Sequence, residues 1–387
     1  MEKVRIGIIG IGNMGSSHAL NIARGRVPGA ELTAVCDINP ERLAWAKANL
    51  GEVQVFSSAE QFYQADCIDA VLIATPHYDH PPLAIAGFQH GLHVLVEKPA
   101  GVYTKQVREM NEVAARSGKV FGIMYNQRTN PLYQKVRDLV QNGELGPLKR
   151  VIWIITNWYR PQSYYDSGGW RATWSGEGGG VLLNQDPHQL DLWQWICGMP
   201  KRVRAFCYFG KYHDIEVEDD VTAFVEYANG ATGLFVTSTG EAPGTNRLEI
   251  SGDRGKIVVE DDRLTFWRLR VSERQFNAEY KGGFGAPEVW ECNVPVYGEN
   301  SQHIGILKNW VEAIRYGKPL LAPGEEGIKG LELSNAMHLS AWTDSWVELP
   351  INEDLFYEML QEKIKQSTYQ KKAASARTLD VSGTFNS

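Results

Sequence analysis

Residues 4–15 have the sequence VRIGIIGIGNMG, an apolar run that leads directly into a glycine-rich turn. The run predicts a buried strand, and the G-x-G-x-x-G pattern that follows it predicts a turn that opens a helix. In such a turn Gly10 permits the tight bend, Gly12 lets the backbone approach a pyrophosphate, and Gly15 allows the helix to pack closely on the strand. The stretch therefore predicts a strand-turn-helix unit whose backbone amides bind a dinucleotide.

The same alternation of strand and helix continues to about residue 125. Strand candidates are 4–9, 32–36, 70–74 and 93–96, and helix candidates are 16–24, 40–50 and 82–90. Apolar runs that alternate with helices are typical of βαβ units in a parallel sheet with helices on both faces. We therefore expect an α/β domain with a doubly wound parallel sheet over residues 1–125.

Asp37 ends the second predicted strand, 22 residues after Gly15. A carboxylate at this place accepts hydrogen bonds from the adenosine ribose and repels a 2′-phosphate, so NAD is favoured over NADP as the cofactor. Arg42 follows closely and would soften that preference.

Two later strand ends face the same crevice, because ligands of open parallel sheets bind beyond the carboxyl ends of the strands. One carries Thr75-Pro76-His77-Tyr78-Asp79-His80, and the other carries Glu97-Lys98-Pro99. Sequence position alone does not decide whether Lys98 is a solvated charge or a cation at the nicotinamide pocket. No Cys or Glu completes a metal set around the paired histidines, so we expect no metal site.

The pattern changes after residue 126. Asn130-Pro131 predicts the start of a helix, and further strand candidates are 151–158, 203–209, 221–227, 232–239, 248–251 and 256–260. Asn229-Gly230, between two of these runs, predicts a type I′ hairpin. Helices are expected at about 302–316 and 325–345. We expect a second α/β domain over residues 126–350, with a large open and mostly antiparallel sheet, and a C-terminal extension over 351–387 whose polar end frays from Lys371 onward.

Composition restricts the classes of partner. The chain of 387 residues carries 39 Lys and Arg against 46 Asp and Glu, a formal net charge of -7. This balance offers no positive surface for a run of phosphates, so we expect no nucleic-acid partner. No apolar run reaches the ~18 residues of a membrane span, and the N-terminal residues lack the pattern of a secretion signal. The five cysteines are odd in number and widely spaced, as in proteins of the reducing cytoplasm.

The stretch 178–191, GGGVLLNQDPHQLD, carries most of the chemistry of the second domain. Asp186 and Pro187 predict the N-cap and first residue of a helix that runs to Cys197. His188 then lies in the first helical turn, where the helix dipole favours the neutral imidazole that acts as a base. Asp191 lies on the same helix face and would orient the ring or offset the dipole. The alternatives are that His188 is a hydrogen-bonded histidine of the core, or that it binds a metal together with Asp186 and Asp191.

These motifs together resemble the glucose-fructose oxidoreductase and inositol dehydrogenase (Gfo/Idh/MocA) family. The resemblance rests on the glycine-rich turn, the Glu97-Lys98-Pro99 tripeptide, Trp170-Arg171, the triple glycine and the H-x-x-D of His188, and it spans residues 4 to about 350. It implies an N-terminal Rossmann domain, an α/β domain whose open sheet commonly makes the oligomer interface, and NAD(P)-linked oxidation or reduction of a hydroxyl on a sugar, glycoside or cyclitol. A homodimer or homotetramer is therefore expected.

The resemblance also assigns roles to single residues. Lys98 matches the family's catalytic lysine and His188 its catalytic histidine. Asn184 stands where the family usually has an aspartate, and an amide cannot supply the negative charge that stabilises a protonated neighbour. The expected cofactor-binding residues are Gly10, Gly12, Asn13, Met14, Gly15, Asp37, Arg42, Thr75, His80, Glu97, Asn126, Trp170 and Arg171.

The expected chemistry is oxidation of a secondary alcohol. It needs a hydride acceptor, a base for the hydroxyl proton and positive charge beside the developing alkoxide, which NAD, His188 and Lys98 would supply. The run 184–188 is similar to glycoside 3-oxidising members and favours C3 of a glucoside or related pyranoside. Inositol dehydrogenase, an NAD-dependent redox glycosidase and a non-catalytic NAD-binding regulator are the alternatives. Aromatic residues near the motif could stack on a sugar ring: Trp153, Trp158, Tyr159, Tyr164, Tyr165 and Trp174.

Overall fold

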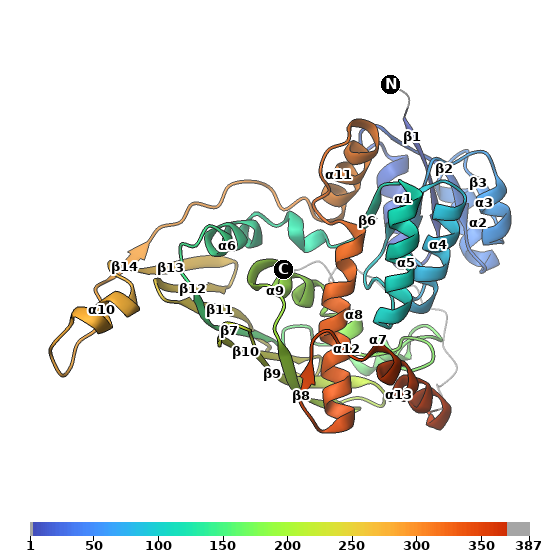
Figure 1. Ribbon diagram of the computed structural model, residues 1–387. Helices are drawn as coiled ribbons and strands as arrows, with labels where there is room; N and C mark the ends of the chain where they lie inside the picture. The colour runs from blue at the N-terminus through green and yellow to red at the C-terminus, as the bar shows by residue number, and fades with distance from the viewer. Residues whose placement is uncertain (1–2, 370–387) are drawn as a thin grey trace.

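The computed structural model describes residues 3–369. It contains two β-sheets, one of six strands and one of nine. Figure 1 shows the six-stranded sheet with its helices at the upper right and the nine-stranded sheet at the lower left. The segment from Lys371 onward, expected to fray, lies outside the described residues.

The six-stranded sheet is parallel throughout and has the order β3-β2-β1-β4-β5-β6. Its strands are β1 (Val4–Ile9), β2 (Ala30–Cys36), β3 (Gln54–Phe56), β4 (Ala70–Ile73), β5 (His93–Val96) and β6 (Phe121–Ile123). The helices between them are α1 (Asn13–Ala23), α2 (Pro40–Asn49), α3 (Ala59–Gln64), η1 (His77–Asp79), α4 (His80–Gln89) and α5 (Thr104–Ser117). The predicted doubly wound sheet is confirmed. β3 and β6, of three residues each, were not predicted.

The nine-stranded sheet has the order β14-β13-β12-β11-β7-β10-β9-β8-β15. Its strands are β7 (Leu148–Ile155), β8 (Arg202–Phe209), β9 (Glu218–Glu226), β10 (Thr232–Ser238), β11 (Asn246–Gly252), β12 (Gly255–Glu260), β13 (Arg263–Leu269), β14 (Val289–Cys292) and β15 (Val347–Glu348). β7 and β10 are parallel and the other neighbours are antiparallel, which confirms a mostly antiparallel sheet.

The turn between β9 and β10 differs from the predicted type. The two strands pair as predicted, and Gly230 has a φ of 85°. Asn229, however, does not have a positive φ, which a type I′ turn requires at both central positions. Its side chain instead accepts a hydrogen bond of 3.0 Å from the backbone N–H of Ala231. The glycine alone supplies the left-handed residue, and the type I′ prediction was wrong.

Helices cover one face of the nine-stranded sheet. The helices of this half of the chain include η2 (Asn126–Thr129), α6 (Pro131–Gln141), α7 (Gln162–Asp166), α8 (Val181–Asn184), α9 (Pro187–Cys197) and α12 (Gly327–Thr343) in chain order. α12 packs against β8 and α9, and α6 packs against α9. The predicted start of α6 is confirmed, because the Asn130 side chain accepts a hydrogen bond of 2.9 Å from Leu132 N. The other face of the sheet exposes Phe206, Tyr208 and Phe224.

Later segments return to the N-terminal sheet or project from the second one. α11 (Gln302–Tyr316) packs against η2 and β1, and the chain then reaches η3 (Gly324–Glu326). α13 (Glu353–Gln366) packs against α5. α10 (Glu273–Glu279) and β14 form an arm that extends from the edge of the second sheet in Figure 1.

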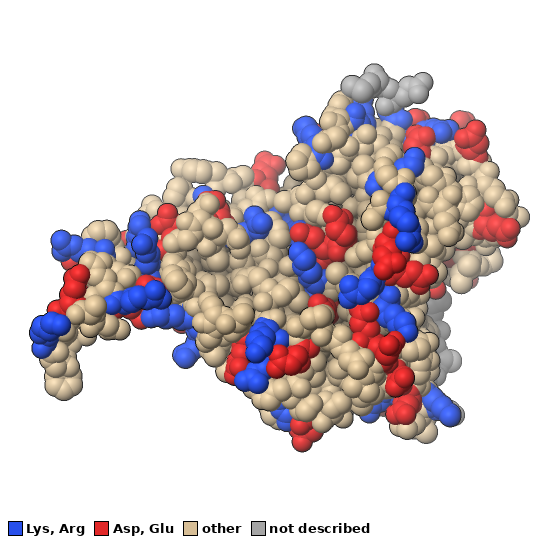
Figure 2. Space-filling view, viewed as in Figure 1, with Lys and Arg blue, Asp and Glu red and all other residues tan. Residues whose placement is uncertain are grey.

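Acidic and basic side chains are interspersed over the face drawn in Figure 2. Among residues 3–369, no helix is both long and apolar enough to cross a membrane.

Candidate active site

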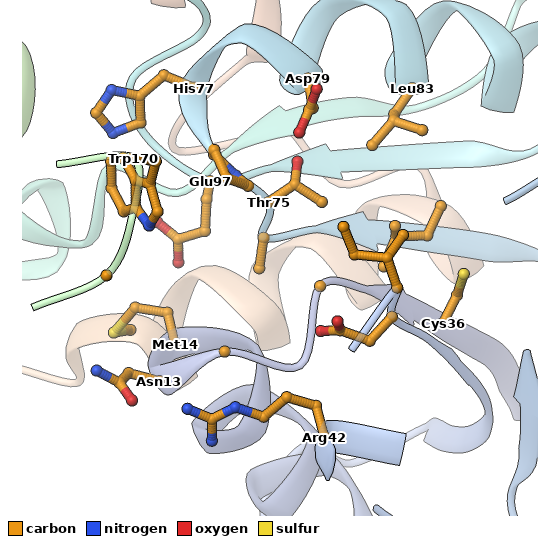
Figure 3. Close-up of a pocket in the computed structure, with 18 of the residues that line it drawn as sticks. Asn13, Met14, Cys36, Arg42, Thr75, His77, Asp79, Leu83, Glu97 and Trp170 are labelled. Carbon is orange, nitrogen blue, oxygen red and sulfur yellow. The ribbon is translucent and has the colours of Figure 1, made fainter. Parts of the chain in front are cut away.

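A pocket of about 660 Å³ lies beyond the carboxyl ends of β1, β2, β4 and β5. Figure 3 shows it as an elongated space, with Cys36 and Leu83 toward one end and His77 with Trp170 toward the other. Its wall includes these predicted site residues: Gly10, Gly12, Asn13, Met14, Asp37, Arg42, Thr75, Glu97, Lys98, Trp170, Arg171 and Asn184. The structure thus brings residues of both halves of the chain to one cavity.

The three glycines of the first turn have different environments. Gly10 has a φ of 88°, a left-handed conformation that favours glycine. A Cβ on Gly15 would lie 1.8 Å from the carbonyl oxygen of Gly10, so only glycine allows α1 to start this close to β1. A Cβ on Gly12 would meet no atom within 4 Å. The space in front of Gly12 and the start of α1 therefore suit a pyrophosphate group.

Asp37 is held at the end of β2 by two backbone donors. Its Oδ2 accepts a hydrogen bond of 2.7 Å from Ile11 N, and its Oδ1 accepts one of 2.8 Å from Asn39 N. A carboxylate oxygen can accept more than one hydrogen bond, so both oxygens keep capacity for ribose hydroxyls. Arg42, on α2, lines the same part of the pocket.

Glu97 and Lys98 follow β5 and have opposite electrostatic environments. Glu97 contacts the Nε2 of the fully buried His18 at 2.6 Å and accepts a hydrogen bond of 3.1 Å from Lys98 N. Against the effect of burial, His18 lowers the pKa of Glu97 to about 2, and His303 and Lys98 act in the same direction. Sequence reasoning missed His18 and His303, whose proximity to Glu97 depends on the packing of α1 and α11.

The ammonium of Lys98 points across the pocket to α8. Its Nζ donates a hydrogen bond of 2.6 Å to the backbone carbonyl of Asn184. Burial lowers the pKa of Lys98 to about 8; Glu97 opposes this effect, whereas Arg171 and Arg160 add to it. The group is thus a cation at neutral pH that loses its proton within reach of ordinary assay conditions.

The triple glycine places α8 against a buried carboxylate. Glu218, at the start of β9, accepts hydrogen bonds of 2.9 Å from Gly180 N and 3.0 Å from Leu182 N. A Cβ on Gly180 would lie 1.9 Å from the carbonyl oxygen of Glu218. Acidic charge at a helix N-terminus is stabilising, and here it fixes the residues that lead to Asn184.

Asp186 is the N-cap residue of α9 as predicted, whereas Asp191 does not have its predicted role. The Asp186 side chain makes no cap hydrogen bond, although α9 begins at Pro187 as predicted. Its carboxyl is buried in the interior, which raises its pKa to about 8. Asp191 does not orient His188, because its two oxygens accept hydrogen bonds of 2.8 and 2.6 Å from the buried Arg128. The prediction that Asp191 orients His188 was wrong, because a tertiary partner outweighs local spacing.

His188 lies in the first turn of α9. Burial lowers its pKa well below 6.5, and Lys98 and His303 lower it further. The imidazole is therefore neutral at pH 7, as the sequence indicated, although burial rather than the helix dipole is the main cause. His188 is not among the lining residues of the pocket, yet the ammonium of Lys98 is close enough to affect its titration.

His80 and Asn126 also lie outside the lining residues. The ring nitrogens of His80 contact the carbonyl oxygens of Pro99 at 2.7 Å and Thr75 at 2.8 Å, so His80 joins the two strand-end loops. The Asn126 amide donates a hydrogen bond to Gln302, and its Oδ1 is buried with no partner in the described part of the chain. A buried acceptor without a donor suits a ligand with an amide or hydroxyl donor.

Tyr164, a member of the predicted aromatic set, contacts Asn184 and Arg171. Its hydroxyl accepts a hydrogen bond of 2.6 Å from Arg171 Nη1 and lies 3.4 Å from Asn184 Oδ1. Three of the others, Trp153, Tyr165 and Trp174, are buried in the core. Trp170, by contrast, lines the pocket and packs edge-on against His77 at 5.2 Å between ring centroids.

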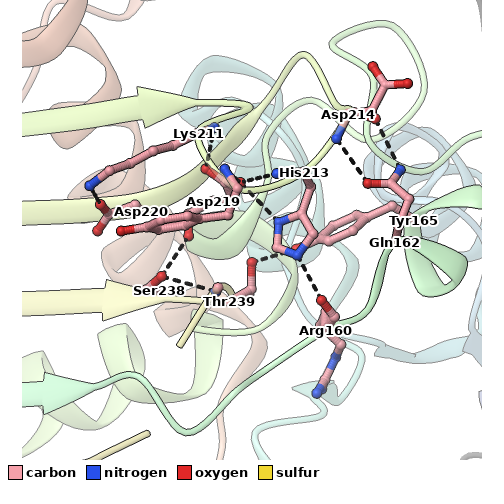
Figure 4. Close-up of polar contacts among 12 residues, drawn as sticks. Arg160, Gln162, Tyr165, Lys211, His213, Asp214, Asp219, Asp220, Ser238 and Thr239 are labelled. Atoms are coloured by element: carbon pink, nitrogen blue, oxygen red, sulfur yellow. Dashed lines mark hydrogen bonds and ion pairs between the residues drawn. The ribbon is translucent and has the colours of Figure 1, made fainter. Parts of the chain in front are cut away.

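A polar network joins the segment around α7, the helix that contains Tyr164, to the nine-stranded sheet (Figure 4). The ring of His213 lies between the carbonyl oxygen of Arg160, at 2.7 Å, and the fully buried carboxylate of Asp219, at 2.9 Å. The hydroxyl of Tyr165 lies 2.7 Å from Thr239 Oγ1. These contacts tie both sides of Tyr164 to the nine-stranded sheet.

The residues present fit NAD. The open space before Gly12 accommodates the pyrophosphate, and Asp37 has free acceptor capacity for the ribose. Glu177 was missed by the sequence reasoning; it is a buried carboxylate that accepts a hydrogen bond from the Asn184 side chain. The sequence feature that could have indicated Glu177 is its position directly before the triple glycine.

Comparisons with known proteins agree with this architecture. Residues 4–125 match the profile described as oxidoreductase family, NAD-binding Rossmann fold, and residues 133–258 match the GFO/IDH/MocA C-terminal domain. The chain is 24% identical over 341 residues to myo-inositol 2-dehydrogenase of Thermotoga maritima, covering 86% of this chain and 95% of the relative. It is 24% identical over 393 residues to levoglucosan dehydrogenase of Pseudarthrobacter phenanthrenivorans, covering 90% and 99%.

A solved structure is similar over almost the whole length. The WlbA dehydrogenase of Bordetella pertussis, in complex with NADH and UDP-GlcNAcA, has 28% sequence identity and a TM-score of 0.77. The similarity covers 91% of this chain and 100% of that one.

Proposed function

The chain belongs to the GFO/IDH/MocA family of oxidoreductases with an NAD-binding Rossmann domain, and we propose that it oxidises a secondary hydroxyl of a sugar, at C3 of a glucoside or related pyranoside. One observation carries this proposal. Lys98 and Asn184 line the cofactor pocket, and Lys98 Nζ donates a hydrogen bond to the backbone carbonyl of Asn184.

The chain's own residues supply the polar chemistry. NAD, when bound, supplies the hydride acceptor. His188, whose imidazole is held neutral by burial, is the base that receives the hydroxyl proton. The Lys98 ammonium stabilises the negative charge that develops on the substrate oxygen, and Asn184 positions the hydroxyl.

The substrate class is supported by the relatives. Their names specify myo-inositol and levoglucosan, and the bound ligand of the WlbA dehydrogenase is UDP-GlcNAcA. All three are rings that carry several secondary hydroxyls. Trp170 lines the pocket together with Asn184 and Lys98, and an aromatic side chain there suits the apolar side of a pyranose.

The test is a substrate panel assayed with NAD by absorbance at 340 nm, together with product analysis. The panel contains methyl glucosides, levoglucosan, myo-inositol and a nucleotide-linked uronic acid. A methyl 3-deoxyglucoside is the matched control, because it lacks only the hydroxyl that we assign as the site of oxidation. We expect turnover of the glucoside and none of the 3-deoxy compound. Equal turnover of both would contradict oxidation at C3.

Inositol oxidation is the second candidate, favoured by the match over 86% of the chain to the Thermotoga enzyme. NADH formation with myo-inositol and none with any glycoside would select it. Release of the aglycone without net NADH would instead indicate a redox glycosidase. NAD binding without turnover of any panel member would indicate a regulator.

Assembly and location are part of the same proposal. The exposed aromatic side chains of Phe206, Tyr208 and Phe224 on the open sheet support a homodimer or homotetramer that buries this face. Light scattering coupled to gel filtration tests it. The five cysteines are free thiols, which supports a reducing, cytoplasmic location.

A further inference from the structure

The family pattern has a carboxylate at position 184, and this chain has an amide. The structure contains a second buried carboxylate next to that amide. Glu177 is 2% exposed, and its Oε1 accepts a hydrogen bond from Asn184 Nδ2. Its Oε2 accepts one of 2.6 Å from Ala172 N, and Arg171 Nη1 lies 3.9 Å from its Oε1. Burial raises the pKa of Glu177, whereas Arg171 and the donors Ala172 N and Asn184 Nδ2 favour its ionised form. A carboxyl group absent from residue 184 is thus present one hydrogen bond away.

This contact determines which atom Asn184 presents to the pocket. The amide nitrogen donates to Glu177, so Oδ1 is on the side of the Tyr164 hydroxyl, 3.4 Å away. That hydroxyl already accepts hydrogen bonds from Arg171 and Gln185, and its own proton is free to point at Oδ1. A flipped amide would place an oxygen against the carboxylate of Glu177, two acceptors in contact. Asn184 therefore presents an acceptor to the substrate hydroxyl, as an aspartate would.

The charge of Glu177 also reaches Lys98. Burial is the main influence on the pKa of Lys98 and lowers it, whereas Glu97 and, more weakly, Glu177 raise it. The backbone carbonyl of Asn184 holds Lys98 Nζ at 2.6 Å while its side chain contacts Glu177. One residue therefore connects the cation to the carboxylate.

We propose that Glu177 is a positioning residue that replaces the aspartate expected at position 184: it fixes the amide of Asn184 so that Oδ1 faces the substrate hydroxyl, and its charge helps to keep Lys98 protonated. This inference rests on the proposed oxidation of a sugar hydroxyl. A purely structural role is the competing explanation, because Glu177 also closes the turn at Ala172.

Moving the carboxylate from position 177 to position 184 distinguishes the positioning role of Glu177 from a purely structural one. Glu177→Gln removes the charge and leaves one oxygen for two donors. Asn184→Asp places two carboxylates in contact, so that they share a proton instead of restoring a full charge. The double variant Glu177→Gln/Asn184→Asp moves the charge to the family's position, with the new amide able to donate to the new carboxylate.

We expect each single variant to lose about 10- to 100-fold in kcat/KM with NAD affinity retained, as for other residues that orient a catalytic group. The double variant recovers a large part of that loss. In Glu177→Gln the fall of kcat/KM on the alkaline side moves to lower pH, because a carboxylate that favours the ammonium is gone. Additive losses in the double variant, or an alkaline limb that does not move, would overturn the proposal.

Glu216→Gln is the matched control. Glu216 anchors the same loop by accepting a hydrogen bond of 2.7 Å from Trp174 N, but no contact joins it to Asn184. We expect this variant to keep the wild-type pH profile, and the same shift in both variants would assign Glu177 a structural role. Absence of turnover by the wild type on the whole panel would refute the proposed function itself, whereas an active wild type with an unaffected Glu177→Gln refutes only this inference.

Discussion

The Nζ of Lys98 lies 2.6 Å from the backbone carbonyl of Asn184 and donates a hydrogen bond to it. Lys98 follows the strand β5 of the parallel sheet, and Asn184 ends α8 on the other side of the pocket. The contact therefore joins the cofactor half of the site to the half that we assign to the substrate. An ammonium held by a neutral carbonyl keeps its charge available for an oxyanion.

Replacing Lys98 by Met tests that charge. The variant keeps most of the side-chain volume and removes the ammonium, so we expect kcat to fall by on the order of 10²-fold or more. NAD affinity, measured by tryptophan fluorescence, should change little. Lys105→Met is the control, since Lys105 is exposed and pairs with Asp354 away from the pocket. Near-normal turnover of Lys98→Met would assign this lysine a structural role.

Two alanine substitutions in the glycine-rich turn should separate folding from cofactor binding. A Cβ at position 15 overlaps the Gly10 carbonyl, so Gly15→Ala should lower the free energy of unfolding by about 1–3 kcal/mol and weaken NAD binding. Gly12 has an ordinary φ of -71° and open space before it. Gly12→Ala should therefore keep its melting temperature and lose NAD affinity by on the order of 10-fold, because the methyl group obstructs the pyrophosphate. If the two variants changed stability by the same amount and NAD affinity by the same amount, the different roles assigned to Gly12 and Gly15 would be refuted.

The carboxylate of Asp37 should set the preference for NAD over NADP. Asp37→Asn removes the repulsion of a 2′-phosphate. We therefore expect the ratio of the dissociation constant for NADP to that for NAD to fall by on the order of 10-fold. Titration with both cofactors measures it. Glu41→Gln, an exposed change in the first turn of α2, is the control for a general effect of charge. An unchanged ratio in Asp37→Asn would assign the preference to another group, such as Arg42.

The fold was predictable where local pattern and tertiary packing agree. β1, β2, β4 and β5 are buried strands with continuous apolar runs, and the structure has them within two residues of the predicted positions. β3 and β6 are three residues long, too short for a periodic pattern. The order of the second sheet, with β7 between β10 and β11, depends on pairings between segments about 80 to 100 residues apart, which no local pattern specifies.

The site was predictable for residues within motifs and not for those brought in by packing. Lys98 and Asn184 lie where the motifs indicated, in the wall of one pocket. His18 contacts Glu97 across a separation of 79 residues, and Tyr164, on the short helix α7, contacts Asn184 across 20 residues. Asp186 satisfied the local pattern of an N-cap, but its carboxyl is buried in the interior.

The acidic limb of the pH profile should belong to His188. Burial, Lys98 and His303 lower the pKa of His188 well below 6.5, so the neutral base predominates at pH 7 and is lost only on acidification. Hence kcat/KM should be level near pH 7 and fall through a limb that lies below pH 6.5. His188→Ala should remove both this limb and most of the activity. His303 also has a lowered pKa, about 4 because of burial, so His303→Asn is the comparison that separates the two rings. The limb should persist in His303→Asn; a limb that survives in His188→Ala would show that another group takes the hydroxyl proton.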